Sequence, residues 1–192
     1  ALGSAAALHA DPIPYANPGT VAPTVVTYAT GTTINAYYYS TSAADYDTIS
    51  IYDLSNGTYF SPQNALPNQS SFPGQEQTFV NNSASVDDQI VFELYNSSVG
   101  ETFASDPSLS SDGINHAYVT SFSGTIPGSS VTVAGTYVGM EDLPLQGSDL
   151  DYNDDTFVFT GVTAPTPEPG SFILLGTGLL GAAGALRRRF TR

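Results

Sequence analysis

The 192-residue sequence predicts an all-β protein: a single antiparallel β-sandwich or jelly-roll-like domain, followed by a short C-terminal transmembrane helix. Short runs rich in Thr, Val, Ile, Tyr and Phe fill residues 11–163, and turn pairs such as Asn56-Gly57 and Asp112-Gly113 separate them. No window of this body sustains the period of a helix. An uncharged apolar run near the C-terminus, followed by three arginines, indicates the final element.

The strands of the body are expected where the apolar runs lie. In residues 48–52 and 88–94 apolar and polar side chains alternate, so one face of each strand should lie on a core. This spacing of antiparallel strands is typical of a sandwich. Strands are predicted at residues 25–29, 33–40, 48–53, 77–80, 89–95, 117–121, 130–138 and 156–162.

The charge of the chain is distributed unevenly. All four basic residues lie after residue 186, so residues 1–186 carry 18 carboxylates and no Lys or Arg. Nucleic-acid binding and phosphate chemistry, which depend on cationic side chains, are therefore not expected of the body. The absence of Cys excludes disulfides, thiolate catalysis and thiolate zinc sites. Clustered carboxylates must be solvated, protonated or neutralised by a metal.

The N-terminal residues 1–10 are small and apolar and precede a polar Asp11-Pro12 pair. This pattern indicates the remnant of a secretory signal peptide, with cleavage after Ala7 or Ala10. A disordered Ala-rich N-terminus is the alternative interpretation. The domain proper is therefore expected to span residues 11–163.

The C-terminal segment has three parts. A Pro-rich linker at 164–170 contains Pro167, Glu168 and Pro169, and the apolar run at 172–186 follows it. At ~1.5 Å per residue this run spans ~22 Å, less than a ~30 Å hydrocarbon core, so a membrane helix at 171–192 would be a short one. The arginines that end it favour a cytoplasmic C-terminus and an exported body, and they are Arg187, Arg188 and Arg189.

This order of Pro-Glu-Pro, Gly/Leu-rich apolar run and arginine cluster resembles the PEP-CTERM sorting signal. The resemblance implies a Gram-negative envelope protein that is anchored transiently in the inner membrane. It also implies processing near the Pro-Glu-Pro element by an exosortase-type membrane transpeptidase, followed by delivery to the cell surface or the extracellular matrix. A Pro-rich linker before an ordinary tail anchor is the alternative.

The densest group of polar residues lies between residues 141 and 154. Oxygen ligands at alternating positions 149, 151 and 153 converge when a chain curls into a loop, and Ca²⁺ takes six to eight oxygens in this way. The segment is not an EF-hand, because Asp154 stands at the position of the required Gly. A solvated acidic turn is the alternative. We predict a structural calcium site with the ligands Glu141, Asp142, Asp149, Asp151, Asn153 and Asp154.

Residues 29–162 resemble an uncharacterised domain family of bacterial secreted and PEP-CTERM proteins. The family signature is an apolar-Glu-Asp element, a Gly-rich spacer and an Asp-x-Asp-Tyr-Asn-Asp run that enters a final strand. In this sequence the elements are residues 140–143, with Met140 where Phe is usual, Gly147, and residues 149–154. The family is commonly taken to bind calcium and has no established activity, so the resemblance implies a metal site without a biochemical function.

His116 lies in an Asp112-Gly113-x-x-His116-Ala117 context that also matches the family. A structural role is expected, in which the imidazole ties a loop by hydrogen bonds. A position behind the metal ligands, shared with Asp112, and direct ligation are the alternatives.

Three functions follow from these features. The leading one is a non-enzymatic exported protein of the cell surface or biofilm matrix, stabilised by Ca²⁺, which would also bridge the anionic body to anionic exopolysaccharide. The second is a glycan-binding module for matrix sugars that uses the acidic loop together with Tyr37, Tyr38 and Tyr39, on which sugar rings would stack. The third is a glycan hydrolase with Glu141 and Asp149 as acid and base.

Overall fold

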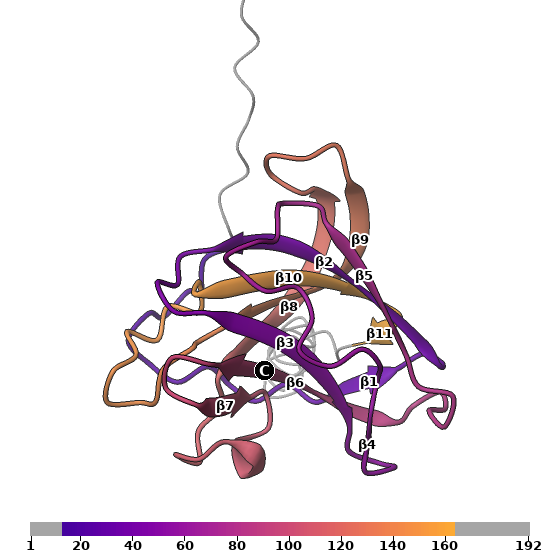
Figure 1. The fold of residues 1–192 in the computed structure, drawn as a ribbon, viewed down its shortest axis with the longest axis horizontal. Coiled ribbons are helices and arrows are strands. Elements are labelled where there is room, and N and C mark those ends of the chain that lie inside the picture. Colours follow the sequence, from indigo (N-terminus) through magenta and orange to yellow (C-terminus); the bar gives the residue numbers. More distant parts are fainter. Residues whose placement is uncertain (1–12, 164–192) are drawn as a thin grey trace, which may run out of the picture.

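A computed structural model describes residues 13–163 of the chain. In this range eleven strands form two antiparallel sheets, and a single 3₁₀ turn, η1 (Pro107–Leu109), is the one helical element (Figure 1). The strands are β1 (Thr27–Ala29), β2 (Thr33–Thr41), β3 (Asp47–Asp53), β4 (Thr58–Tyr59), β5 (Glu76–Val80), β6 (Gln89–Asn96), β7 (Glu101–Ala104), β8 (Ala117–Thr125), β9 (Thr132–Met140), β10 (Asp155–Thr160) and β11 (Val162–Thr163).

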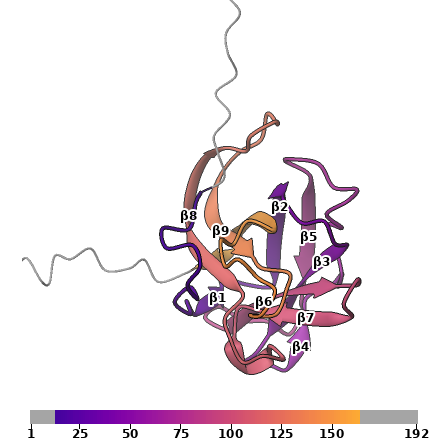
Figure 2. The same ribbon diagram turned by 90° about the vertical axis from the view of Figure 1, so that its left-hand side faces the viewer.

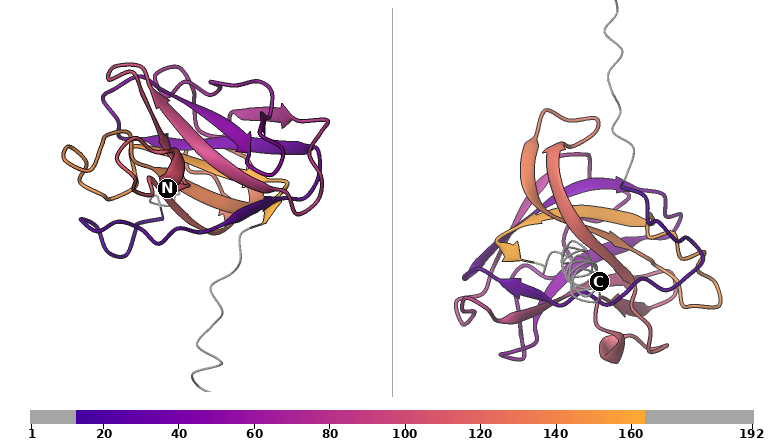
Figure 3. Two further views of the ribbon diagram at one scale, coloured as in Figure 1. Left: turned by 90° about the horizontal axis from the view of Figure 1, so that it is seen from below. Right: turned by 180° about the vertical axis from the view of Figure 1, so that it is seen from behind.

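The first sheet has the strand order β11-β1-β6-β3-β4, and β7 pairs with the end of β6 beyond β1. The second sheet has the order β5-β2-β10-β9-β8. The two sheets face each other, as the two views of Figure 3 show from below and from behind. The predicted all-β antiparallel sandwich is therefore confirmed for the residues that the structure describes.

The main core lies between the two sheets. Alternate residues of β3 and β6 supply one side of it, and residues of β2, β9 and β10 supply the other. Phe92 of the first sheet and Phe159 of the second meet there with ring centroids 4.5 Å apart. Both side chains are fully buried, and burial of each stabilises the fold by about 2–3 kcal/mol.

The second sheet is curled, and the concave outer face carries a second buried cluster. Tyr39 of β2 and Phe122 of β8 have ring centroids 5.6 Å apart, although β10 and β9 lie between their strands in the sheet. Figure 2 shows the β8–β9 hairpin standing opposite β2 and β5. The turn of this hairpin reaches the loop before β5, where a Cβ on Gly74 would lie 2.7 Å from Ser129. The curl therefore buries an aromatic cluster outside the sandwich core.

The observed strands lie where strands were predicted, with four main differences. The strand predicted at 117–121 is longer, because β8 continues to Thr125. The short strands β4 and β7 were not predicted. The predicted strand at 130–138 begins later and ends at Met140, inside the core. The predicted strand at 156–162 divides at Gly161, which has a φ of 80° and lies so close to the backbone of Thr33 that a Cβ would approach its oxygen to 2.4 Å. The chain thereby passes from the second sheet to the first.

Three predicted segments lie outside the described residues: the signal-peptide remnant at 1–10, the Pro-rich linker at 164–170 and the helix at 171–192. Within residues 13–163 no helix is long and apolar enough to cross a bilayer.

Candidate metal centre

The predicted acidic segment forms the loop between β9 and β10, at the end of the sandwich on the left in Figure 1. Leu150 and Tyr152 adopt positive φ angles of 55° and 59°, so the backbone enters the left-handed conformation at these two alternate positions of the loop. Both side chains are buried against the N-terminal segment, where the rings of Tyr15 and Tyr152 meet edge to face with centroids 5.0 Å apart. Leu150 and Tyr152 therefore point inward, and the acidic residues on either side of them are left to face one another.

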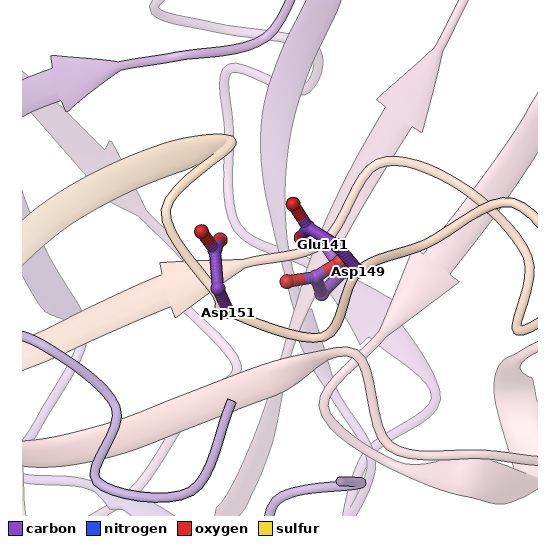
Figure 4. A group of neighbouring side chains, drawn as sticks. All are labelled: Glu141, Asp149 and Asp151. Carbon is purple, nitrogen blue, oxygen red and sulfur yellow. The ribbon is translucent and has the colours of Figure 1, made fainter. Parts of the chain in front are cut away.

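Three of the predicted ligands converge in this loop: Glu141, Asp149 and Asp151 (Figure 4). One carboxylate oxygen of each lies within 4.8 Å of the other two. Oxygens on opposite sides of a Ca²⁺ ion are about 4.8 Å apart, since each lies roughly 2.4 Å from the ion. The spacing therefore suits an ion of this size with carboxylate ligands.

Glu141 is fully buried and organises the loop. Its two carboxylate oxygens accept hydrogen bonds from the N–H of Tyr152, the N–H of Leu150 and the hydroxyl of Ser148. Because a carboxylate has about four acceptor positions, one remains available for a cation. Burial, together with the negative charges of Asp154 and Asp149, raises the pKa of Glu141 to about 7.

Asp149 is exposed and Asp151 is partly exposed, so this side of the triad opens to solvent. Asn153 holds Asp151 in place: its N–H donates to Asp151 Oδ1 at 3.1 Å and its side-chain amide donates to Oδ2. Burial, followed by the charge of Asp149, raises the pKa of Asp151. Asn153, itself a predicted ligand, therefore supports Asp151 through these hydrogen bonds. The side-chain oxygen of Asn153 accepts a hydrogen bond from the hydroxyl of Ser42.

The six predicted ligands do not form one group. Asp142 and Asp154 belong to a different set of side chains, in which Asp142 interacts with Asp154 and with Asp47 of β3. Successive side chains of an extended chain point in opposite directions, so Glu141 and Asp142 face different groups. The structure therefore divides the predicted site into the triad Glu141, Asp149 and Asp151 and a second acidic group beside it.

His116 and Asp112 are paired at the side of the loop. His116 is fully buried, and its Nε2 lies 3.0 Å from Asp112 Oδ1. Asp112 also accepts a hydrogen bond from the N–H of Leu145 at 2.9 Å, and the N–H of Glu141 donates to the carbonyl of His116. Burial acts to raise the pKa of Asp112, but the hydrogen bonds from Leu145, His116 and Ile114 outweigh burial. The pKa of Asp112 therefore lies below its ordinary value. These bonds tie the loop to the end of β8, in line with the structural role expected of His116.

The interpretation of Tyr37, Tyr38 and Tyr39 as a sugar-stacking surface is wrong for two of the three. Tyr38 lies in the core between the sheets and Tyr39 in the cluster on the outer face, each 2 % exposed. The error arises because the curl of the second sheet buries both faces of β2. Tyr37 remains partly exposed and donates a hydrogen bond to Glu76.

Sequence reasoning missed Asp47 and Asp155, the acidic residues that begin β3 and β10. Both are almost completely buried. Each carboxylate directly precedes a predicted strand, which was a signal for it, but spacing along the chain does not reveal which strand ends meet.

Comparison with known proteins identifies the tail of the chain. A family model described as the PEP-CTERM protein-sorting motif matches residues 165–189, which confirms the predicted sorting signal. The motif implies export, transient membrane anchoring and an exosortase as processing partner. No curated protein and no solved structure matches the chain. Because the match covers the tail alone, the resemblance of the body to a calcium-binding secreted family stays a prediction.

Proposed function

We propose that this chain is a non-enzymatic protein of the cell surface or extracellular matrix of a Gram-negative bacterium, built on a calcium-stabilised β-sandwich and released by exosortase processing. The sorting motif at residues 165–189 carries the proposal of an exported protein. The triad Glu141, Asp149 and Asp151 supports the proposal of calcium. Calcium at the open side of the triad also offers a contact for anionic polysaccharide, which the acidic body would otherwise repel.

Calcium suits the triad because of the chemistry of its donors. The three ligands are carboxylates, the hard oxygen donors that Ca²⁺ prefers. No Lys or Arg in residues 1–186 competes for them. Two like charges 4 Å apart repel by ~4 kcal/mol at an effective dielectric constant of 20, and a bound cation offsets this repulsion through its attraction to each carboxylate.

A hydrolase with Glu141 and Asp149 as acid and base is less well supported. A general acid must come within hydrogen-bonding reach of the substrate oxygen. Glu141 is fully buried, and three hydrogen bonds from its own loop occupy its oxygens. The buried position favours a loop-organising and ion-binding role over proton transfer to a bound glycan.

The calcium proposal is tested by thermal melting of the 192-residue chain at pH 7.5 in EDTA and in CaCl₂. A free Ca²⁺ concentration 100 times Kd stabilises the folded state by about 2.7 kcal/mol. This corresponds to a rise in Tm of roughly 5–10 °C for a domain of this size. Asp151→Asn removes one anionic ligand and is expected to shift the Ca²⁺ midpoint at least tenfold upward.

Asp87→Asn is the matched control, because Asp87 is an exposed aspartate in a turn and Asn tolerates its φ of 70° well. The control should reproduce the wild-type response to Ca²⁺. An equal Tm in EDTA and CaCl₂ for the wild-type chain would refute the calcium part of the proposal.

The sorting proposal is tested in a Gram-negative host that carries an exosortase. Replacement of Pro167, Glu168 and Pro169 by Ala removes the element near which the transpeptidase is expected to act. The variant should remain at full length in the inner-membrane fraction, whereas the unaltered chain should be shortened and recovered from the cell surface or the medium. Equal fractionation of the two chains would contradict surface delivery through this motif.

A further inference from the structure

A second group of carboxylates lies beside the triad, at the same end of the sandwich. Its side chains form a row in which Asp155 interacts electrostatically with Asp47, Asp47 with Asp142, and Asp142 with Asp154. One amide nitrogen, Asn68 Nδ2, lies 3.0 Å from Asp47 Oδ2 and 3.3 Å from Asp155 Oδ2, and the backbone nitrogen of Asp142 lies 3.2 Å from Asp154 Oδ2. Asp47 begins β3 of the first sheet, whereas Asp155 begins β10 of the second sheet, and Asp142 and Asp154 lie at the two ends of the β9–β10 loop. The row therefore bridges the two sheets.

The row is buried more deeply than the triad. Asp47 is 1 % exposed, Asp155 is 0 % exposed and Asp142 is 4 % exposed. Burial of an ionised carboxylate is costly unless the charge is paired or hydrogen-bonded. Residues 1–186 contain no Lys or Arg that could pair with it.

The hydrogen-bond donors that the described residues place around Asp47 and Asp155 are also too few to satisfy all of their carboxylate oxygens. Among residues 13–163, no N–H or O–H group donates to Asp47 Oδ1 or to Asp155 Oδ1, although both atoms are buried. The amide nitrogen of Asn68 lies within 3.0–3.3 Å of Asp45 O, Asp47 Oδ2 and Asp155 Oδ2. Because this amide has two hydrogens, it cannot satisfy all three acceptors fully. Within the described residues, two buried oxygens of the row, Asp47 Oδ1 and Asp155 Oδ1, are therefore left without a hydrogen-bond partner.

The opposite end of β3 shows how this fold satisfies a buried aspartate without a cation. Asp53 is also fully buried, but it accepts hydrogen bonds from the N–H of Asn56, the amide of Asn56 and the amide of Asn81 at 2.9–3.1 Å. Residues 13–163 offer Asp47 and Asp155 no equivalent set of donors, and one oxygen of each is left without a partner there. The contrast indicates that the row is built for a ligand that supplies positive charge.

We propose that Asp47, Asp142, Asp154 and Asp155 hold a second divalent cation, Ca²⁺, which links the two sheets at the end of the sandwich. The orphaned oxygens of Asp47 and Asp155 bind the ion, and the neighbouring carboxylates complete its charge. This site is separate from the triad and stands whether or not the triad binds calcium. Its ion fastens β3 to the ends of β9 and β10, so it acts on the stability of the whole sandwich, whereas the triad acts on one loop.

The electrostatics of the row agree with this proposal. Burial, followed by the charge of Asp47, raises the pKa of Asp142 to about 6 and that of Asp155 well above its ordinary value. Burial and the charge of Asp142 raise the pKa of Asp154 to about 7. The row therefore retains protons when no cation is bound, and a divalent cation would displace these protons and offset the repulsion among the ionised carboxylates.

The test is a calorimetric titration of the EDTA-treated 192-residue chain with CaCl₂ at pH 7.5. We expect two Ca²⁺ ions per wild-type chain. Asp47→Asn and, separately, Asp155→Asn should reduce the stoichiometry to one, and Asp87→Asn should leave it at two. In EDTA the Asp47→Asn chain should melt at a higher temperature than wild type, because a buried charge has been replaced by an amide that can donate to its neighbours.

A variant confined to the triad keeps the proposal testable if the buried substitutions prevent folding. The double variant Asp149→Asn/Asp151→Asn should still bind one Ca²⁺ ion, and binding of none would overturn the second site. Folded Asp47→Asn and Asp155→Asn chains that bind as many ions as wild type would also overturn it. If the double variant binds as many ions as wild type, the proposal of calcium at the triad is refuted, whereas the proposal of the second site is supported.

Discussion

Without divalent cations, the domain is expected to be more stable at pH 5 than at pH 8, with a difference in Tm of about 10 °C. The cause is the set of buried carboxyl groups whose pKa values burial raises: Asp47 and Asp142 to about 6, and Glu141 and Asp154 to about 7. The shift of Glu141 from 4.5 to about 7 alone corresponds to about 3 kcal/mol, at ~1.4 kcal/mol per pKa unit.

The direction of this dependence follows from where the protons bind. Between the unfolded pKa values of 3.8–4.5 and the folded values of 6–7, the folded state holds more protons than the unfolded chain. The free energy of unfolding therefore falls as the pH rises through this window, and the stabilisation is fully present below it. Asp112 acts in the opposite direction, because its pKa is lowered, but it is a single group near the surface.

Thermal melts in EDTA from pH 5 to pH 8 measure this dependence. Repulsion among exposed carboxylates has the same sign, so the series is repeated in 0.5 M NaCl, which screens exposed charges more than buried ones. The difference should persist in high salt and become smaller in Asp47→Asn. Saturating Ca²⁺ should raise Tm more at pH 8 than at pH 5, because protons compete with the metal for carboxylates. A Tm that rises with pH in EDTA would contradict the buried-carboxylate assignment.

The sequence predicted the architecture better than the site because the two depend on different distances along the chain. Alternation within residues 48–52 and 88–94 is local, and it identified β3 and β6 as strands with one face on the core. The triad was also found, since Glu141, Asp149 and Asp151 lie on one loop. The PEP-CTERM motif, likewise, is contiguous in sequence.

The features that were missed depend on contacts between distant segments. Asp47 meets Asp142 and Asp155 only because the ends of β3, β9 and β10 come together across the sandwich. Tyr39 is buried only because the second sheet curls until β8 faces β2. The local pattern of apolar residues predicts neither the order of the strands in a sheet nor the curvature of that sheet.

Gly139→Ala is expected to destabilise the domain by about 3 kcal/mol, which lowers Tm by roughly 6–12 °C, and to weaken Ca²⁺ binding at the triad. A Cβ at this position of β9 would lie 2.2 Å from the carbonyl oxygen of Tyr152. The loop cannot move away freely, because the N–H of Tyr152 donates to Glu141 and its hydroxyl accepts from the N–H of Ala22 at 2.7 Å. Relief of the clash therefore breaks contacts that shape the triad.

Gly147→Ala separates this steric effect from the general consequences of replacing glycine. Gly147 lies in the β9–β10 loop, where an added Cβ would meet Leu143 at an ordinary distance of 3.7 Å. The unfolding free energy of the Gly147→Ala chain should therefore stay within about 0.5 kcal/mol of that of the wild type. Alanine in a strand is intrinsically more favourable than glycine by roughly 0.5–1 kcal/mol. A loss of stability in Gly139→Ala must therefore come from the close approach of the loop to β9. Urea unfolding of both variants in EDTA and in CaCl₂ measures the two effects, and a Gly139→Ala chain as stable as wild type would show that the loop does not rest on β9 as described.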